Sequence, residues 1–113
     1  MNENENESED ESENGTVYIV AQIQVEDWDT YESDYLPKTL ERITAHGGEV
    51  LVASEAAEEL EGEWDGNWTV IIEFPSEADA YAFMQDEEYV EAMRARHEAA
   101  AWNDIAMLPA FDG

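Results

Sequence analysis

The order of its short apolar segments is the feature that most constrains the fold of this chain. Apolar residues occupy every second position of residues 16–25 and again of residues 68–74, a period typical of strands with one buried face. Residues 49–53 and 104–109 are two shorter strand-like runs. Between the strands, two stretches carry apolar residues at helical spacing. The sequence therefore predicts the order strand, helix, strand, strand, helix, strand.

The first helix is expected to run from an aspartate N-cap at position 27 or 29 to about residue 45. Pro37 lacks a backbone donor and should kink this helix or divide it in two. The Gly47-Gly48 pair supplies a residue for the left-handed backbone at the helix end. The apolar stripe of the helix is predicted to consist of Tyr31, Tyr35, Leu36, Leu40 and Ile43.

The second helical region begins just after Pro75. Ser76 and Asp79 match a capping box, in which a hydroxyl and an acidic side chain satisfy the first amides of a helix. Asp86 is the expected N-cap of a further helix. The apolar residues of the two helices are Ala80, Phe83 and Met84 in the first, and Tyr89, Val90, Met93 and Ala100 in the second.

This order of elements predicts an α+β, ferredoxin-like βαββαβ domain over residues 16–113. Its four-stranded antiparallel sheet carries the helices on one face. Tyr18, Val20 and Ile71 fall on the other face, which the helices leave uncovered. We expect a second copy of the sheet to cover them, so that the protein is a homodimer joined through its sheet faces. Residues 1–15 are acidic, of low complexity, and expected to be disordered.

The charge of the chain restricts its environment and its partners. Thirty Asp and Glu face only four Lys and Arg, giving a net charge of −26. Residues 1–14 hold seven of the acids and no base, so the rest of the chain carries −19. Such self-repulsion is screened only at high salt, which predicts a halophilic protein. Nucleic acids and anionic membranes are excluded as partners because binding phosphates requires Lys and Arg.

Neither secretion nor membrane insertion is indicated. The acidic N-terminus has no apolar signal region, and no apolar run approaches the roughly 18 residues of a membrane span. We therefore expect a cytoplasmic location. There is no cysteine, hence no disulfide or thiolate chemistry.

The chain resembles the family called domain of unknown function 1330, within the dimeric α+β barrel superfamily, as an acidic, haloarchaeal-type member. The resemblance implies a ferredoxin-like subunit whose sheets pair face to face, and it implies no agreed activity. An acidic EWDGN turn at residues 63–67 departs from the family pattern and speaks against an anion-binding role for that turn. The matching pieces are Val17-Tyr18-Ile19-Val20, Tyr31 and Tyr35 with Pro37, Gly47-Gly48, Leu60-Glu61-Gly62, Ile72-Glu73-Phe74-Pro75-Ser76, Glu88-Tyr89 and Arg96.

The candidate ligand-binding residues are Tyr18, Tyr31, Tyr35 and Arg96. Arg96 is one of only four cations, and its planar fork of donors can either bridge a nearby carboxylate or bind an anionic ligand inside the barrel. Tyr18 can orient a ligand with its hydroxyl or simply pack in an interface. His46 is expected to cap the end of the first helix.

Metal ions and cofactors are not expected. Residues 61–66 imitate the start of a calcium loop, but Ile72 stands where such a loop needs its bidentate Glu. The two histidines lack the close spacing of a zinc site.

Three classes of function remain open from the residues alone. The first is a small-molecule binding or sensing domain that uses an apolar, aromatic pocket between sheet and helices. The second is a cofactor-free enzyme resembling the monooxygenases and isomerases of the superfamily. The third is a structural or interaction protein without a pocket. An enclosed cavity containing Tyr18 or Arg96 favours the first two, and a fully packed interior favours the third.

Overall fold

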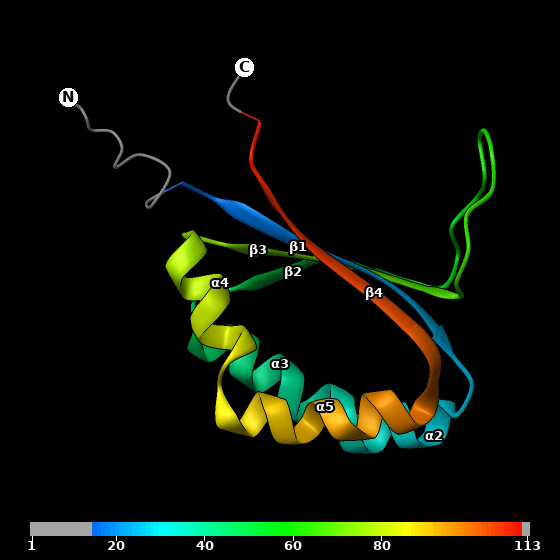
Figure 1. Ribbon diagram of the computed structural model, residues 1–113, viewed down its shortest axis with the longest axis horizontal. Coiled ribbons are helices and arrows are strands. Elements are labelled where there is room, and N and C mark those ends of the chain that lie inside the picture. The colour runs from blue at the N-terminus through cyan, green and yellow to red at the C-terminus, as the bar shows by residue number, and fades with distance from the viewer. Residues whose placement is uncertain (1–14, 112–113) are drawn as a thin grey trace.

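The computed structural model describes residues 15–111, and the acidic segment at residues 1–14 lies outside the described part (Figure 1). Strands and helices alternate nearly as the sequence predicts. No helix of the described part is long and apolar enough to cross a membrane. The elements are β1 (Val17–Val25), α2 (Trp28–Thr30), the π-helical turn η1 (Tyr31–Tyr35), α3 (Leu36–Ala45), β2 (Glu49–Ser54), β3 (Trp68–Phe74), α4 (Glu77–Met84), α5 (Glu87–Ala99) and β4 (Ala100–Pro109).

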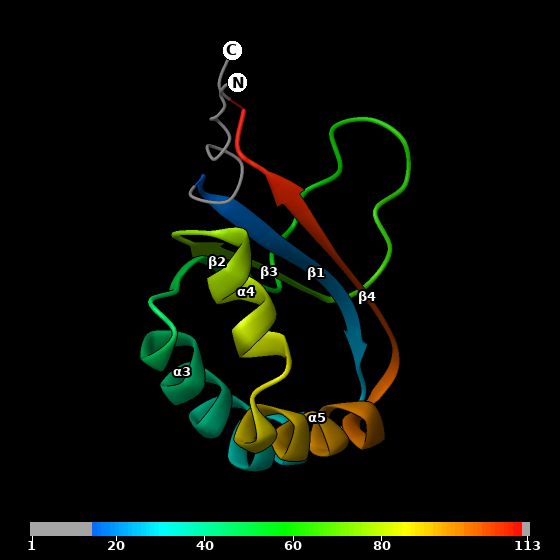
Figure 2. The same cartoon turned by 60° about the vertical axis from the view of Figure 1, so that its left-hand side comes forward.

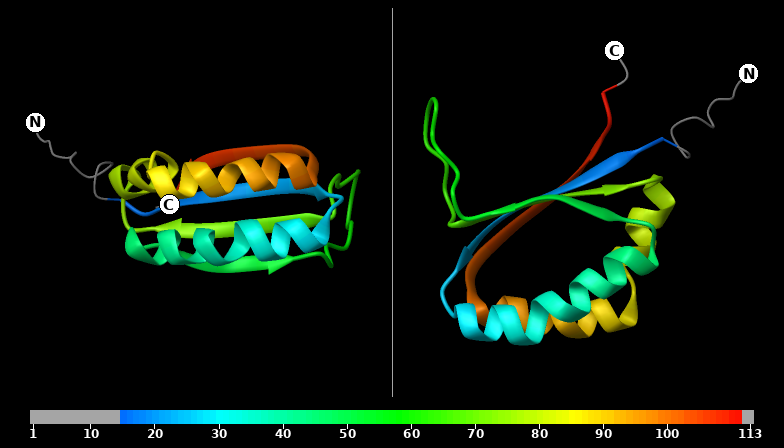
Figure 3. Two further views of the ribbon diagram at one scale, coloured as in Figure 1. Left: turned by 90° about the horizontal axis from the view of Figure 1, so that it is seen from below. Right: turned by 180° about the vertical axis from the view of Figure 1, so that it is seen from behind.

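The four strands form one antiparallel sheet in the order β2-β3-β1-β4. All helices lie on one face of it, with α3 along β2 and β3, and with α5 along β1 and β4 (Figure 3). Figure 2 shows α4 leading from the end of β3 to α5. The long connection between β2 and β3 projects away from the helices (Figure 1). The expected ferredoxin-like α+β fold is thereby confirmed.

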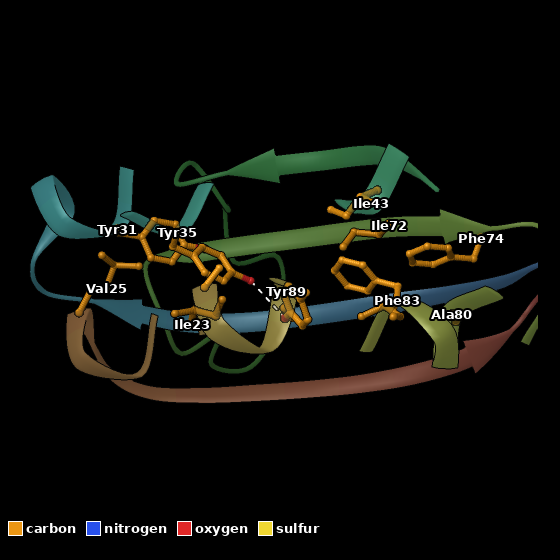
Figure 4. Close-up of a cluster of buried hydrophobic side chains, with 14 of the residues drawn as sticks. Ile23, Val25, Tyr31, Tyr35, Ile43, Ile72, Phe74, Ala80, Phe83 and Tyr89 are labelled. Atoms are coloured by element: carbon orange, nitrogen blue, oxygen red, sulfur yellow. Dashed lines mark hydrogen bonds between the residues drawn. The ribbon is translucent and has the colours of Figure 1, made fainter. Parts of the chain in front are cut away.

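The core lies between the sheet and the helices. Every second residue of β1, from Val17 to Val25, is buried, as the alternation predicts. Phe83 of α4 contacts both the sheet and α5. Its ring centroid lies 5.4 Å from that of Phe74 in β3 and 4.2 Å from that of Tyr89 in α5 (Figure 4). Such offset aromatic contacts add to the free energy gained by burial.

The first helical segment contains a π turn that changes which residues face the core. Asp27 caps its start by accepting the Thr30 amide at 3.1 Å. The π turn ends at Tyr35, and Pro37 lies in the first turn of α3, which agrees with the expected division of the helix. The turn holds more residues than an α-helical one, so the later side chains are rotated. Thr39 is therefore buried, whereas Leu40, predicted on the apolar stripe, is 48% exposed.

Helix α3 ends in a tight glycine turn. Gly47 adopts a left-handed φ of 81°, which confirms the expected use of glycine at this end. Gly48 is required for a different reason, since a Cβ there would lie 2.6 Å from the Phe74 ring. The two glycines thus allow β2 to begin close to the buried side chain of Phe74.

The last strand starts earlier than predicted. It begins at Ala100, directly after α5, whereas the sequence indicated a start at Asp104. The alanines at 100 and 101 favour a helix by intrinsic propensity. Antiparallel pairing of Val25 with Ala100 and of Gln24 with Trp102 overrides that preference. Ala100, predicted to lie in the helix, therefore belongs to the sheet.

Asp86 joins the two long helices. Its Oδ2 lies 2.8 Å from His46 Nε2 and 2.9 Å from Arg42 Nη2, at the end of α3. Its Oδ1 accepts the amides of Glu88 and Tyr89 and so caps α5. His46 is thus the C-cap residue of α3, and its side chain also contacts Asp86. His46, Arg42 and the two amides hold the pKa of Asp86 well below its usual range.

Asp86→Asn should lower the free energy of unfolding at neutral pH, because the amide keeps the cap but loses the charge. A carboxylate whose pKa is depressed in the folded state stabilises above its unfolded pKa of about 3.9 and loses that contribution as the pH falls below it. The difference between wild type and variant should shrink as the pH falls below about 4. Urea titrations at each pH measure it, and a difference that widens below about pH 4 would contradict this account.

Candidate functional site

A cavity lies between the sheet and the helices. Its volume is ≈60 Å³. Leu40 and Ala53 line it and are exposed, so it opens between α3 and the edge strand β2. In the described part of the chain, no aspartate, glutamate, lysine or arginine lines it. Its walls are Ile19, Ala21 and Ile23 of β1, Val70 and Ile72 of β3, Thr39 and Ile43 of α3, and Phe83, Met84 and Tyr89 of the last two helices, with Tyr31 and Tyr35.

Three buried tyrosines bring hydroxyl groups to this apolar space. Tyr31 and Tyr35 are the first and last residues of η1, with ring centroids 4.9 Å apart. The hydroxyls of Tyr35 and Tyr89 lie 3.3 Å apart in a hydrogen bond (Figure 4). Burial raises the pKa of Tyr31 and of Tyr35 above the usual tyrosine range. The phenols therefore stay protonated and act as hydrogen-bond donors.

Arg96 is buried directly behind the tyrosines, with 2% of its surface exposed. It comes from the last turn of α5, and its Nη1 donates to Asn103 Oδ1 at 2.7 Å. Its guanidinium carbon lies 5.5 Å from the centre of the Tyr35 ring, a cation–π distance. Among residues 15–111 no carboxylate lies within 4.0 Å of it. The carboxylate bridge considered for Arg96 is thus replaced by a neutral amide in the described part.

Three of the four predicted site residues come together, and the fourth does not. Tyr31, Tyr35 and Arg96 form one cluster between η1 and α5. Tyr18 lies on the opposite face of the sheet, where it pairs with Glu73 and Leu108. Its place follows from strand alternation, since its neighbours Val17 and Ile19 face the core.

The structure also adds residues that the sequence did not single out. Asn103 was missed because the last strand was expected to begin after it, and Thr39 because the π turn is invisible in the apolar pattern. Tyr89 and Trp68 were recognised as apolar positions only. The signal that could have found Tyr89 is its polar hydroxyl on a buried helix face, since such a group needs a partner.

Several polar atoms of this region have no hydrogen-bond partner. They are Thr39 Oγ1, Trp68 Nε1 and Arg96 Nε, all fully buried. Thr39 and Trp68 line the cavity. Leaving a buried donor unpaired costs about 1–3 kcal/mol, so such groups mark places where a ligand or water completes the structure.

Thr39→Val should stabilise the unliganded protein by about 1 kcal/mol, because it removes an unpaired buried hydroxyl and keeps the shape. Thr39→Ser is the matched control, since it keeps the hydroxyl and loses a methyl group, and it should destabilise by a similar amount. Urea unfolding measures both. A destabilised Thr39→Val protein would show that the hydroxyl is satisfied in solution.

The fold and its internal cavity define a ferredoxin-like α+β subunit with a largely apolar pocket. Residues 16–109 match the family described as Domain of unknown function (DUF1330), and the chain belongs to this family. No curated protein matches the chain.

Solved structures with a similar fold come from several bacteria. A protein of unknown function from Rhodopseudomonas palustris is 19% identical, with a TM-score of 0.73 over 88% of this chain and 85% of that one. SnoaB, a cofactor-independent oxygenase from Streptomyces nogalater, is 12% identical, with a TM-score of 0.65 over 88% and 96%. A dimeric ferredoxin-like protein of unknown function from Thermobifida fusca YX is 9% identical, with a TM-score of 0.53 over 85% and 92%. At these identities the likeness concerns the fold.

Proposed function

We propose that this protein binds a small molecule in the cavity between its sheet and helices. The observation that carries the proposal is an apolar cavity in which the buried Thr39 hydroxyl has no partner among residues 15–111. Pockets for small molecules are mainly apolar with a few placed polar groups, and this composition matches. Tyr31 and Tyr35 orient the ligand, and Arg96 supplies charge behind them. Tyr18 belongs to the outer sheet face.

The proposal is tested by extracting protein purified in molar KCl and identifying bound small molecules by mass spectrometry. Wild type should carry a molecule at near-stoichiometric amount. Ala21→Leu, which fills the cavity from β1, should carry much less, whereas Ala82→Leu on the exposed side of α4 should resemble wild type. Equal loading of all three proteins, or none of any compound, would refute a site in this cavity.

The working unit in this proposal is a homodimer joined through the sheet faces. On the outer face, Val20 pairs with Ile71 on one side and with Ala106 on the other. Val52 pairs with Ile71 and continues the apolar strip to β2, while Leu108 is 50% exposed at its other end. A continuous apolar strip on the outer sheet face favours contact with a partner protein over exposure to solvent. The protein from Thermobifida fusca YX with a similar fold is dimeric, which supports this proposal.

The proposed environment is a salt-rich cytoplasm. A net charge of −26 on 113 residues is tolerable where the screening length is short. Dense carboxylates then keep the surface hydrated without forcing the subunits apart.

A cofactor-free enzyme is the second candidate, favoured by one specific observation. The Tyr35–Tyr89 hydroxyl pair, next to the Arg96 cation, is an arrangement that can hold and move a proton in a dry cavity. The similarity of the fold to a cofactor-independent oxygenase is compatible with it. Turnover of the molecule identified by mass spectrometry would distinguish an enzyme from a binding protein.

A further inference from the structure

Arg96 is a buried cation whose charge is not balanced by a neighbouring acid. It is 2% exposed, its Nη1 is bonded to the neutral Asn103, and its Nε has no partner within residues 15–111. The carbonyls in the last turn of α5 offset only part of the charge. Burying an ion without a counter-ion is costly, so a missing anion is the simplest completion of this site.

The wall between Arg96 and the cavity consists of hydrogen-bond donors. The hydroxyls of Tyr35 and Tyr89 share one hydrogen bond between them, so one O–H remains free to donate. Tyr31, Thr39 and the Trp68 indole add further donors, and no carboxylate lines the cavity. The site therefore offers donors with a positive charge behind them, and it offers no charged acceptor.

The field of Arg96 reaches this wall. Burial raises the pKa of both Tyr31 and Tyr35, and the positive charge of Arg96 opposes that rise at each of them. The groups that face Arg96 from the neighbouring elements are Tyr31 and Tyr35 of η1, Tyr89 of α5 and Asn103 of β4. None of these four side chains is a carboxylate. A negative oxygen placed among the tyrosine hydroxyls would feel the same field.

We propose that the ligand of this cavity is an organic anion, with an apolar body and one negatively charged oxygen, either a carboxylate or a phenolate-type oxygen. The inference rests on the proposed small-molecule site and adds the chemical class of its ligand. The anionic oxygen accepts hydrogen bonds from the tyrosine hydroxyls, and Arg96 acts through Tyr35 as a positioning charge. The apolar body lies along Ile19, Ala21 and Val70 of the sheet.

Because the protein as a whole is strongly negative, a preference for anionic over neutral ligands is informative about the cavity itself. A surface of −19 or more repels any anion, and at molar salt the repulsion is screened within about 3 Å. A preference for anions measured in molar KCl therefore reports the local field of the cavity. It cannot come from the surface, whose sign is opposite.

The test compares isosteric probes by calorimetry or tryptophan fluorescence in molar KCl at pH 7. The carboxylate arm uses 2-naphthoate against 2-naphthamide, and benzoate against benzamide as a smaller pair. The phenolate arm uses 4-nitrophenol at pH 8.5, where it is the phenolate, against 4-nitroaniline, a neutral molecule of the same shape, with the bound anion followed by its visible absorption. Wild type should bind the anion of at least one pair at least about tenfold more tightly than the neutral partner, since hydrogen bonds to charged groups are the stronger ones. The arm that shows the preference identifies the oxygen.

Three variants assign the preference to Arg96. Arg96→Met should abolish the anion preference while the neutral probe binds within about twofold of wild type, because Met keeps an unbranched apolar side chain there and removes the charge together with the hydrogen bond to Asn103. Arg96→Lys should retain part of the preference, and it replaces the Met variant if that protein does not fold. Arg94→Met is the matched control, because Arg94 lies on the same helix with its side chain 74% exposed, and its loss should change nothing.

Each outcome bears on a different statement. Neutral and anionic probes that bind wild type equally would overturn the anion inference and leave the binding site standing. An anion preference that survives in folded Arg96→Met would also overturn it. Failure of every probe to bind, or binding that Ala21→Leu does not affect, would overturn the proposed site and this inference together.

Discussion

Raising KCl from about 0.1 M to molar concentration should raise the melting temperature of this protein by about 10 °C or more, equivalent to about 2 kcal/mol for a domain of this size. The cause is the net charge of −26, most of which lies outside residues 1–14. In dilute salt these carboxylates repel one another across roughly 10 Å, and in molar salt across about 3 Å. Compaction brings them together, so screening favours the folded state.

A control separates charge screening from the general effect of salt on apolar burial. Replacing Glu87, Glu91 and Glu98 of α5 with Gln removes three charges from an exposed helix face while keeping size and hydrogen-bonding capacity. The variant should melt higher than wild type at 0.1 M and should respond less steeply to salt. Circular dichroism over the salt range measures both slopes. A melting temperature that is flat or falls with salt would rule out the halophilic account.

Val20→Glu should weaken the dimer by at least about a hundredfold, or about 3 kcal/mol, because a charge would be buried without a partner. Val20 sits in the middle of the outer sheet face, between Ile71 and Ala106. In a symmetric interface the substitution occurs twice, so two carboxylates would face the same apolar surface. Light scattering in molar KCl should show a dimer for wild type and a monomer for the variant at the same concentration.

Val90→Glu is the matched control for this prediction. It adds the same charge at a partly exposed position of α5, on the helical side of the subunit, and should leave the dimer intact. A wild-type protein that is monomeric in molar KCl, or a Val20→Glu protein that remains dimeric, would contradict assembly through the sheet faces.

Local signals in the sequence were sufficient for most of the fold. The alternation in residues 17–25 fixes which face of β1 is buried, and the caps at Asp27, Ser76 and Asp86 lie where their side chains accept the first amides of a helix. These features depend on neighbours a few residues away, so they can be read without knowledge of the rest of the chain.

Features set by distant contacts could not be read in the same way. The start of β4 at Ala100 depends on pairing with β1, some 75 residues earlier, and overrides helix propensity. After the π turn, Thr39 is buried and Leu40 lies at the exposed mouth of the cavity, which the apolar helix pattern does not reveal. At the site, Tyr31, Tyr35 and Arg96 were predicted because aromatic and scarce cationic residues stood out. Asn103 was not, since nothing local marks an amide as the partner of an arginine.

The most direct test of the central claim, that the cavity between sheet and helices binds a small molecule, is a crystal structure of the protein grown in high salt with its co-purified compound or the tightest probe. The account predicts electron density for the molecule beside Tyr31 and Tyr35, in the cavity that opens next to Leu40. The anionic oxygen of the molecule should point toward the hydroxyls of Tyr35 and Tyr89. A molecule bound only on the outer surface, or a cavity closed by side chains at saturating concentration, would contradict it.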